Sequence, residues 1–141
     1  MQSIIRLGER WQLNKYGFAL IGSITSIASA RLYVGFGGPL DFSILGHSLH
    51  HFYYGVSLLI LSGILRLKRI NPNLIALLVG LSLGYMTDET TLLIFVGHPY
   101  TMKLYDSPIN VSMDILLLIG LLRLSAQEDR IHVSYEPEVA L

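Results

Sequence analysis

The sequence predicts an all-α membrane protein, a polytopic bundle of four transmembrane helices. Of its 141 residues, 52% are hydrophobic and 14% are charged, and the mean hydropathy is +0.53. This composition leaves too little polar surface for an ordinary soluble domain of this size. Several continuous apolar stretches reach the roughly 17 to 25 residues that a spanning helix needs. Spanning β-strands would instead alternate in polarity over segments of about ten residues.

The predicted spans form one domain over residues 16–124. They cover residues 16–36, 44–65, 74–97 and 108–124. Residues 1–15 are expected to form a cytoplasmic or interfacial segment, because their apolar side chains and Trp11 share one helical face. Residues 125–141 are expected to form a solvated, acidic cytoplasmic tail.

The positions of Lys and Arg predict the orientation in the membrane. Eight of them lie before the first span, between the second and third, or after the fourth, and the opposite side holds only Arg31 and Lys103. The positive-inside rule therefore places both termini in the cytoplasm. No basic patch suited to nucleic acid is present, so membrane lipids are the expected partners. The absence of Cys excludes disulfides and thiolate ligands.

Small residues indicate which helix faces pack together. In the third span Ala76, Gly80, Gly84 and Asp88 follow one another at intervals of four, and small residues allow helices in lipid to approach closely. Asp88 is therefore predicted to face its neighbours rather than lipid. The first span carries a similar ladder and the fourth a polar pair on one face, namely Gly22, Ser26 and Ala30, and Asn110 with Asp114.

Ionisable residues occur at similar depth in the second, third and fourth spans. They are His47, His50 and His51, then Asp88 and Glu89, then Asp114. Such a residue costs roughly 2.5 to 3.5 kcal/mol in a spanning helix, so it usually marks a pathway, a bound ion or a catalytic group. The rise of about 1.5 Å per residue places all of them in one layer nearer the outer surface. On a continuous helix the imidazoles could point into one cavity.

A divalent transition metal would hold such a cluster together. Interhelical hydrogen bonds in membranes average only about 0.6 kcal/mol, whereas structural zinc provides on the order of 10 to 16 kcal/mol. Imidazole with carboxylate suits zinc or iron, and the spacing of His47 and His51 presents two imidazoles to one ion on a helix. The predicted ligands are His47, His50, His51, Asp88, Glu89 and Asp114. Neutral imidazoles and protonated carboxyl groups that only hydrogen-bond remain the alternative.

The site suggests an enzyme, among other functions. Glu89 could act as a general base, and Tyr54, which lies within helical reach of His50 and His51, could donate a hydrogen bond. The predicted activity is that of a metal-dependent hydrolase or oxidoreductase on a lipid or isoprenoid from the outer leaflet. A proton or cation conduit and a structural subunit of a membrane complex stay open, as does a homo-oligomer.

Two resemblances accompany these residues. The order of motifs resembles a widespread group of small prokaryotic integral membrane proteins and extends from Asp41 to Leu122; its residues are His50, His51, Gly55, Asp88, Glu89, Tyr105 and Asp114. This resemblance implies a prokaryotic cell membrane and supports the site, but it brings no activity. Separately, the segment from His47 to His51 is similar to the H-x-x-H-H box of membrane di-iron desaturases and hydroxylases, over that motif only.

Overall fold

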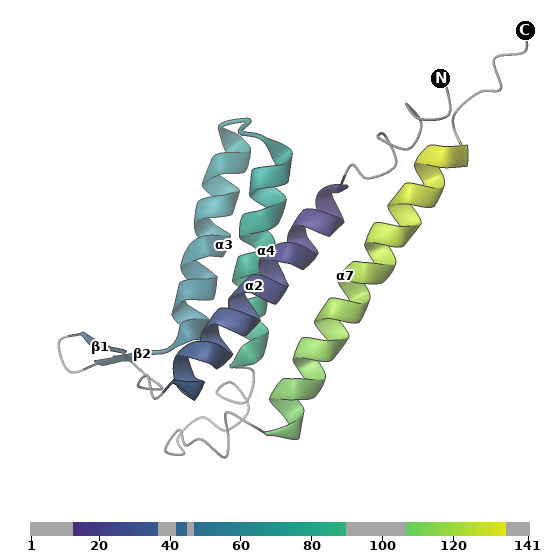
Figure 1. Ribbon diagram of the computed structural model, residues 1–141. Helices are drawn as coiled ribbons and strands as arrows, with labels where there is room; N and C mark the ends of the chain where they lie inside the picture. The colour runs from purple at the N-terminus through teal and green to yellow at the C-terminus, as the bar shows by residue number, and fades with distance from the viewer. Residues whose placement is uncertain (1–12, 37–41, 45–46, 90–106, 135–141) are drawn as a thin grey trace, which may run out of the picture.

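The computed structural model describes residues 13–36, 42–44, 47–89 and 107–134, and within them it confirms a helical fold. The elements are α2 (Lys15–Gly35), β1 (Phe42–Ile44), β2 (His47–Leu49), α3 (His51–Leu67), α4 (Pro72–Asp88) and α7 (Pro108–Ser134). Figure 1 shows α3 and α4 as an antiparallel pair, with α2 packed across them and α7 beside α2. The predicted interfacial segment before residue 13 lies outside the described residues.

Two of these helices are long and apolar enough to cross a membrane. They are α2, over Lys15–Gly35, and the Pro108–Asp129 part of α7. Helix α3 is apolar but has 17 residues, and α4 has the same length. By length and composition, the described residues therefore support two candidate spans, where the sequence predicts four.

The closest packing joins the backbones of α2 and α4. A Cβ atom added at Gly80 would overlap the backbone of Ala19, and one added at Gly22 would overlap the backbone of Leu77. The hydroxyl of Ser23 donates a hydrogen bond across this contact to the Gly80 carbonyl, at 2.9 Å. The predicted small-residue ladder of α2 is buried, namely Gly22, Ser26 and Ala30. On α4 Gly80 and Gly84 are buried, whereas Ala76, the first residue of that predicted ladder, is partly exposed.

Helices α3 and α4 form a hairpin with a similarly close contact. Ser82 Oγ donates to the Gly55 carbonyl at 2.7 Å, and glycine is needed at position 55 because a Cβ there would lie 2.8 Å from the Ser82 carbonyl oxygen. In the connection Arg69 adopts a left-handed conformation with φ of 55°. Asn71 then caps α4 by accepting from the backbone N–H of Asn73 at 2.9 Å.

The start of α3 differs from the prediction. Residues 44–65 were expected to be one helix, but Phe42–Ile44 and His47–Leu49 pair as antiparallel strands and α3 begins at His51. The predicted helical spacing of His47 and His51 is therefore wrong.

The ends of α4 and α7 also differ from the predicted spans. Helix α4 ends at Asp88 rather than at residue 97; the residues that follow include Thr90 and Thr91, which are poor helix formers. Helix α7 continues past the predicted end at residue 124 to Ser134, and residues 125–134 contain no Gly or Pro that would end it. Much of the predicted solvated tail is thus part of this helix.

The far end of α7 is tied to the beginning of α2. Asn14 Nδ2 donates to the Ser125 carbonyl at 2.8 Å and to Asp129 Oδ1 at 2.7 Å. Lys15 Nζ lies 2.9 Å from Glu128 Oε1. The two helices are therefore linked at the end of the bundle that also holds the turn between α3 and α4.

Candidate functional site

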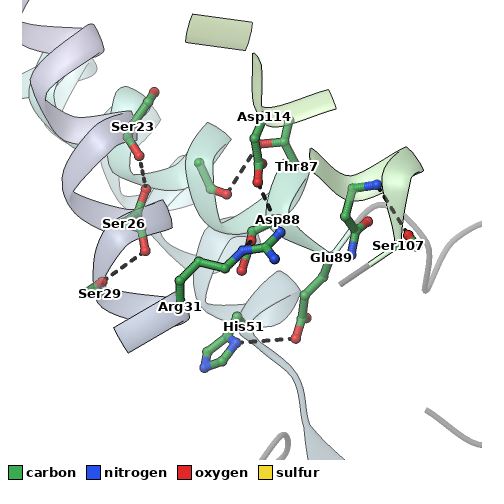
Figure 2. Close-up of polar contacts among 12 residues, drawn as sticks. Ser23, Ser26, Ser29, Arg31, His51, Thr87, Asp88, Glu89, Ser107 and Asp114 are labelled. Atoms are coloured by element: carbon green, nitrogen blue, oxygen red, sulfur yellow. Dashed lines mark hydrogen bonds and ion pairs between the residues drawn. The ribbon is translucent and has the colours of Figure 1, made fainter. Parts of the chain in front are cut away.

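A group of ionisable side chains lies at the opposite end of the bundle, where α2 and α4 end and α3 and α7 begin (Figure 2). Arg31 comes from the last part of α2, His51 is the first residue of α3, and Asp88 is the last residue of α4. Glu89 directly follows α4, and Asp114 lies in the second turn of α7. These five residues are called the polar cluster below.

Arg31 binds carboxylates from two other helices. Its Nε donates to Asp88 Oδ1 at 2.6 Å, and its Nη2 donates to Asp114 Oδ2 at 3.2 Å (Figure 2). The Arg31 side chain is 25% exposed, whereas that of Asp88 is fully buried and that of Asp114 is 9% exposed. One guanidinium group therefore joins α2, α4 and α7. The predicted inward orientation of Asp88 and Asp114 is confirmed, and Asn110 is buried as well.

Glu89 joins the end of α4 to the start of α3. Its Oε2 accepts a hydrogen bond from the backbone N–H of Phe52 at 2.7 Å. This N–H belongs to the first turn of α3, whose donors have no partner within the helix. The carboxylate also lies at the positive end of the helix dipole. Since Glu89 is fully buried, these contacts explain why a carboxylate can occupy this position.

The other carboxylate oxygen of Glu89 faces the imidazole of His51. Glu89 Oε1 lies 3.3 Å from His51 Nδ1 (Figure 2). Both atoms are buried, and neither makes a well-directed hydrogen bond to any residue that the structure describes. More than about 90% of buried polar groups in proteins have a hydrogen-bond partner. Among the described residues, His51 Nδ1 and Glu89 Oε1 are exceptions, so both atoms could still bind a further group.

Three tyrosine rings surround His51. The ring centroid of Tyr33 lies 6.2 Å from that of His51 at an interplanar angle of 87°, that of Tyr54 at 6.0 Å and 51°, and that of Tyr85 at 6.1 Å and 21°. The Tyr85 hydroxyl lies 3.1 Å from Ser29 Oγ, which fixes it against α2. We call these three residues the tyrosine collar. It holds the imidazole so that one ring nitrogen faces Glu89.

The polar cluster contains more negative than positive charge. Asp88, Glu89 and Asp114 are at most 6% exposed, and the cation that contacts two of them is Arg31. If the imidazole is neutral and all three carboxyl groups are ionised, three carboxylates and one guanidinium leave two negative charges without a counter-charge among the described residues. A buried charge without compensation costs several kcal/mol. The cluster is therefore suited to take up a cation or protons.

The structure gathers some of the predicted site residues and separates others. His51, Asp88, Glu89 and Asp114 lie in the polar cluster, and Tyr54 lies in the tyrosine collar. His50 precedes α3 in an extended conformation, with φ of −80° and ψ of 158°. His47 lies on β2 instead of a helix. Among the residues that the structure describes, no group of three or more His, Asp and Glu is arranged to hold a metal ion. Tyr105 lies outside those residues.

Part of the site was not predicted from the sequence. The charge pattern predicts Arg31 on the outer side. An arginine within a spanning helix is often paired with another ionisable residue, and this signal could have linked Arg31 to Asp88. Tyr33 and Tyr85 come from helices other than that of His51, and no spacing rule along one helix relates them to it.

The chain was also compared with known proteins. No protein-family model, no characterised protein and no solved structure gives a significant match. The relationship to small prokaryotic membrane proteins therefore stays a prediction.

Proposed function

We propose that the chain is an integral membrane protein of the prokaryotic cell membrane that crosses the bilayer four times and binds a divalent transition metal. The candidate spans α2 and α7 support the membrane location. Large apolar side chains are also exposed on α3 and α7, with Ile60 61% exposed and Leu116 63% exposed. Lipid is the natural environment for so much exposed apolar surface. At 17 residues, α3 and α4 reach the lower limit for a span.

The proposed orientation places the polar cluster near the outer surface, with both termini in the cytoplasm. Lys68 and Arg69 lie in the turn between α3 and α4, at the end of the bundle opposite the cluster. Positively charged connections favour the cytoplasmic side. At the cluster end, Tyr33, Tyr53 and Tyr54 are 46%, 51% and 38% exposed. Exposed tyrosines at one level are typical of the boundary between lipid and water.

The observation that carries the metal proposal is the separation of two buried atoms. Two ligands bound tetrahedrally at about 2.0 to 2.1 Å from a zinc ion lie about 3.3 Å apart. His51 Nδ1 and Glu89 Oε1 are 3.3 Å apart and are not used in a well-directed hydrogen bond. A divalent ion would also compensate the two excess negative charges of the polar cluster. His51 and Glu89 would hold the ion, and further ligands would complete its coordination.

Arg31 changes the expected roles of the other carboxylates. Asp88 and Asp114 each accept from its guanidinium group, so in this proposal they neutralise Arg31 and hold three helices together. The metal, when bound, would supply an activated water for hydrolysis or a redox centre for oxidation. The proposed substrate is a lipid or isoprenoid that reaches the site from the outer leaflet.

The contacts of the buried hydroxyl groups do not favour a proton conduit. Ser23, Ser26 and Ser82 each donate to backbone carbonyl oxygens. A hydroxyl group must both accept and donate a mobile hydrogen bond to relay a proton, and these donors are fixed in helix contacts. The alternative to metal binding is that the polar cluster only holds the helices together.

Elemental analysis of protein purified without chelators tests the proposal. We expect about one equivalent of zinc or iron, or its uptake on titration, in the unmodified chain. Glu89→Gln and His51→Ala should each lower the affinity at least tenfold, because each removes a proposed ligand. Glu128→Gln is the matched control, since it makes the same change at the other end of the bundle. Less than about a tenth of an equivalent, with no uptake on titration, would leave the structural role as the explanation.

A further inference from the structure

The turn between α3 and α4 carries three cations within four residues. Arg66 lies in the last turn of α3, and Lys68 and Arg69 follow the end of that helix. All three residues are exposed, at the end of the bundle opposite the polar cluster (Figure 1). None of them makes an ion pair with a residue that the structure describes. The described fold therefore leaves their charges available to a partner.

Acidic residues do not offset the charge of this turn. Helix α3, the turn and α4 contain no Asp or Glu before Asp88, which lies at the far end of α4. At the near end of the bundle, Glu128 contacts Lys15 and Asp129 contacts Asn14. Beyond the described side chains, the two ends of the sequence contribute equal numbers of acids and arginines: Glu9, Glu136 and Glu138, with Arg6, Arg10 and Arg130. The turn is thus a local excess of positive charge.

Arg69 occupies a position at which glycine is the usual residue. Its N–H donates to the Arg66 carbonyl at 3.1 Å, and the N–H of Ile70 donates to the Leu65 carbonyl at 3.2 Å. These two bonds form a Schellman motif, in which the residue after the C-cap is left-handed and is usually Gly. Arg69 has a φ of 55°, a conformation in which a residue with a Cβ is strained. The helix end alone would therefore favour glycine, and the arginine indicates a use for its charge.

Large apolar side chains are exposed next to these cations. Leu67, between Arg66 and Lys68, is 84% exposed, and Ile70, directly after Arg69, is 39% exposed. Cations combined with exposed apolar side chains are typical of segments at the boundary between lipid headgroups and acyl chains. A nucleic acid or a free phosphate ion would compensate the charge but would leave the apolar side chains in water. An anionic phospholipid supplies both a phosphate group and an acyl chain.

We infer that Arg66, Lys68 and Arg69 bind the headgroup phosphate of an anionic phospholipid in the cytoplasmic leaflet, with Leu67 and Ile70 against its acyl chains. A Lys or Arg near an anionic membrane surface changes the affinity about fivefold. This inference rests on the membrane location and orientation of the proposed function, but it does not need the metal. It adds a lipid-binding site at the end of the bundle opposite the polar cluster.

Isothermal titration of the full chain, solubilised in an uncharged detergent, with a short-chain phosphatidylglycerol tests this inference. We expect saturable binding that becomes weaker as the salt concentration rises, because exposed charges are screened. A phosphatidylcholine of the same chain length, whose headgroup has no net charge, should bind at least tenfold more weakly. Inorganic phosphate and a short single-stranded DNA, which lack acyl chains, should also bind at least tenfold more weakly.

Arg69→Gly separates a role in lipid binding from a role in the fold. Glycine relieves the left-handed backbone, so the melting temperature should rise, whereas the affinity for phosphatidylglycerol should fall about fivefold. Adding Arg66→Gln and Lys68→Gln should bring the loss to about a hundredfold. Arg123→Gln is the matched control, because it removes an exposed arginine of α7 outside this turn, and its affinity should stay within about twofold of that of the unmodified chain.

The outcomes separate this inference from the proposed membrane location. Equal binding of phosphatidylglycerol and phosphatidylcholine, or unchanged binding by Arg69→Gly, would overturn the inference. Phosphate or DNA that binds as tightly as the lipid would overturn it as well. Washing the membranes with alkali tests the location: a chain that is retained but shows no preference for the anionic lipid overturns this inference alone, whereas a chain that is released overturns the membrane location together with it.

Discussion

Replacing Arg31 with leucine is expected to destabilise the bundle, because it leaves two buried carboxylates without their shared counter-charge. Asp88 is fully buried and the Asp114 side chain is 9% exposed. Removal of one partner from a buried ion pair costs about 3 to 5 kcal/mol. The Arg31 side chain is 25% exposed, so part of this interaction is screened by solvent or headgroups. We therefore expect the lower value, about 3 kcal/mol.

Thermal unfolding in detergent micelles, followed by far-UV circular dichroism, measures this change. For a chain of this size, 3 kcal/mol corresponds to a decrease in melting temperature of about 12 °C. Combining Arg31→Leu with Asp88→Asn and Asp114→Asn removes all three charges and should recover most of the loss. The reasoning is refuted if Arg31→Leu melts within about 3 °C of the unmodified chain, or if the triple variant is no more stable than the single one.

Two other predictions concern the helix contacts. Gly80→Ala should lower the free energy of unfolding by about 1 to 3 kcal/mol, since the new Cβ overlaps the backbone of Ala19. Gly63→Ala is the control and should be neutral or slightly stabilising, because a Cβ there meets nothing within 4 Å. Equal shifts in the melting temperatures of the two variants would contradict the close contact at Gly80. Asn14→Ala removes the acceptor for the Gly17 N–H and the link to Ser125, so it should destabilise the chain by about 1 to 2 kcal/mol. Hydrogen exchange of the Gly17 amide should then become faster, and an unchanged rate would show that the cap is unimportant.

The helices and their buried faces could be predicted because both depend on hydropathy and residue spacing within a single segment of the chain. Hydropathy located each helix, and the four-residue spacing of Gly80, Gly84 and Asp88 identified the inward face of α4 correctly. The burial of Asp114 followed from the same kind of spacing. These predictions needed no knowledge of which helices are neighbours.

The limits of the helices and the partners in the site could not be obtained in this way. Hydropathy does not distinguish a short apolar strand from the start of a helix, so β2 and the last residue of β1 fall within a predicted span, and His47 falls within a predicted helical metal motif. The contact of Arg31 with Asp114 depends on how α2 and α7 lie against each other. Spacing within either helix does not contain that information. For the same reason the rings of Tyr33 and Tyr85 around His51 were missed.

In the proposed membrane protein, Arg31 is synthesised before both of its ion-pair partners, and this order affects membrane insertion. The arginine is translated 57 residues before Asp88 and 83 residues before Asp114. While the nascent chain leaves the ribosome, Arg31 therefore has neither counter-ion, and an arginine without a partner makes the insertion of its helix less favourable. Stable integration of the first helix should follow the emergence of the third, so truncated chains that stop before position 88 should be retained at the translocon or extracted by mild alkali.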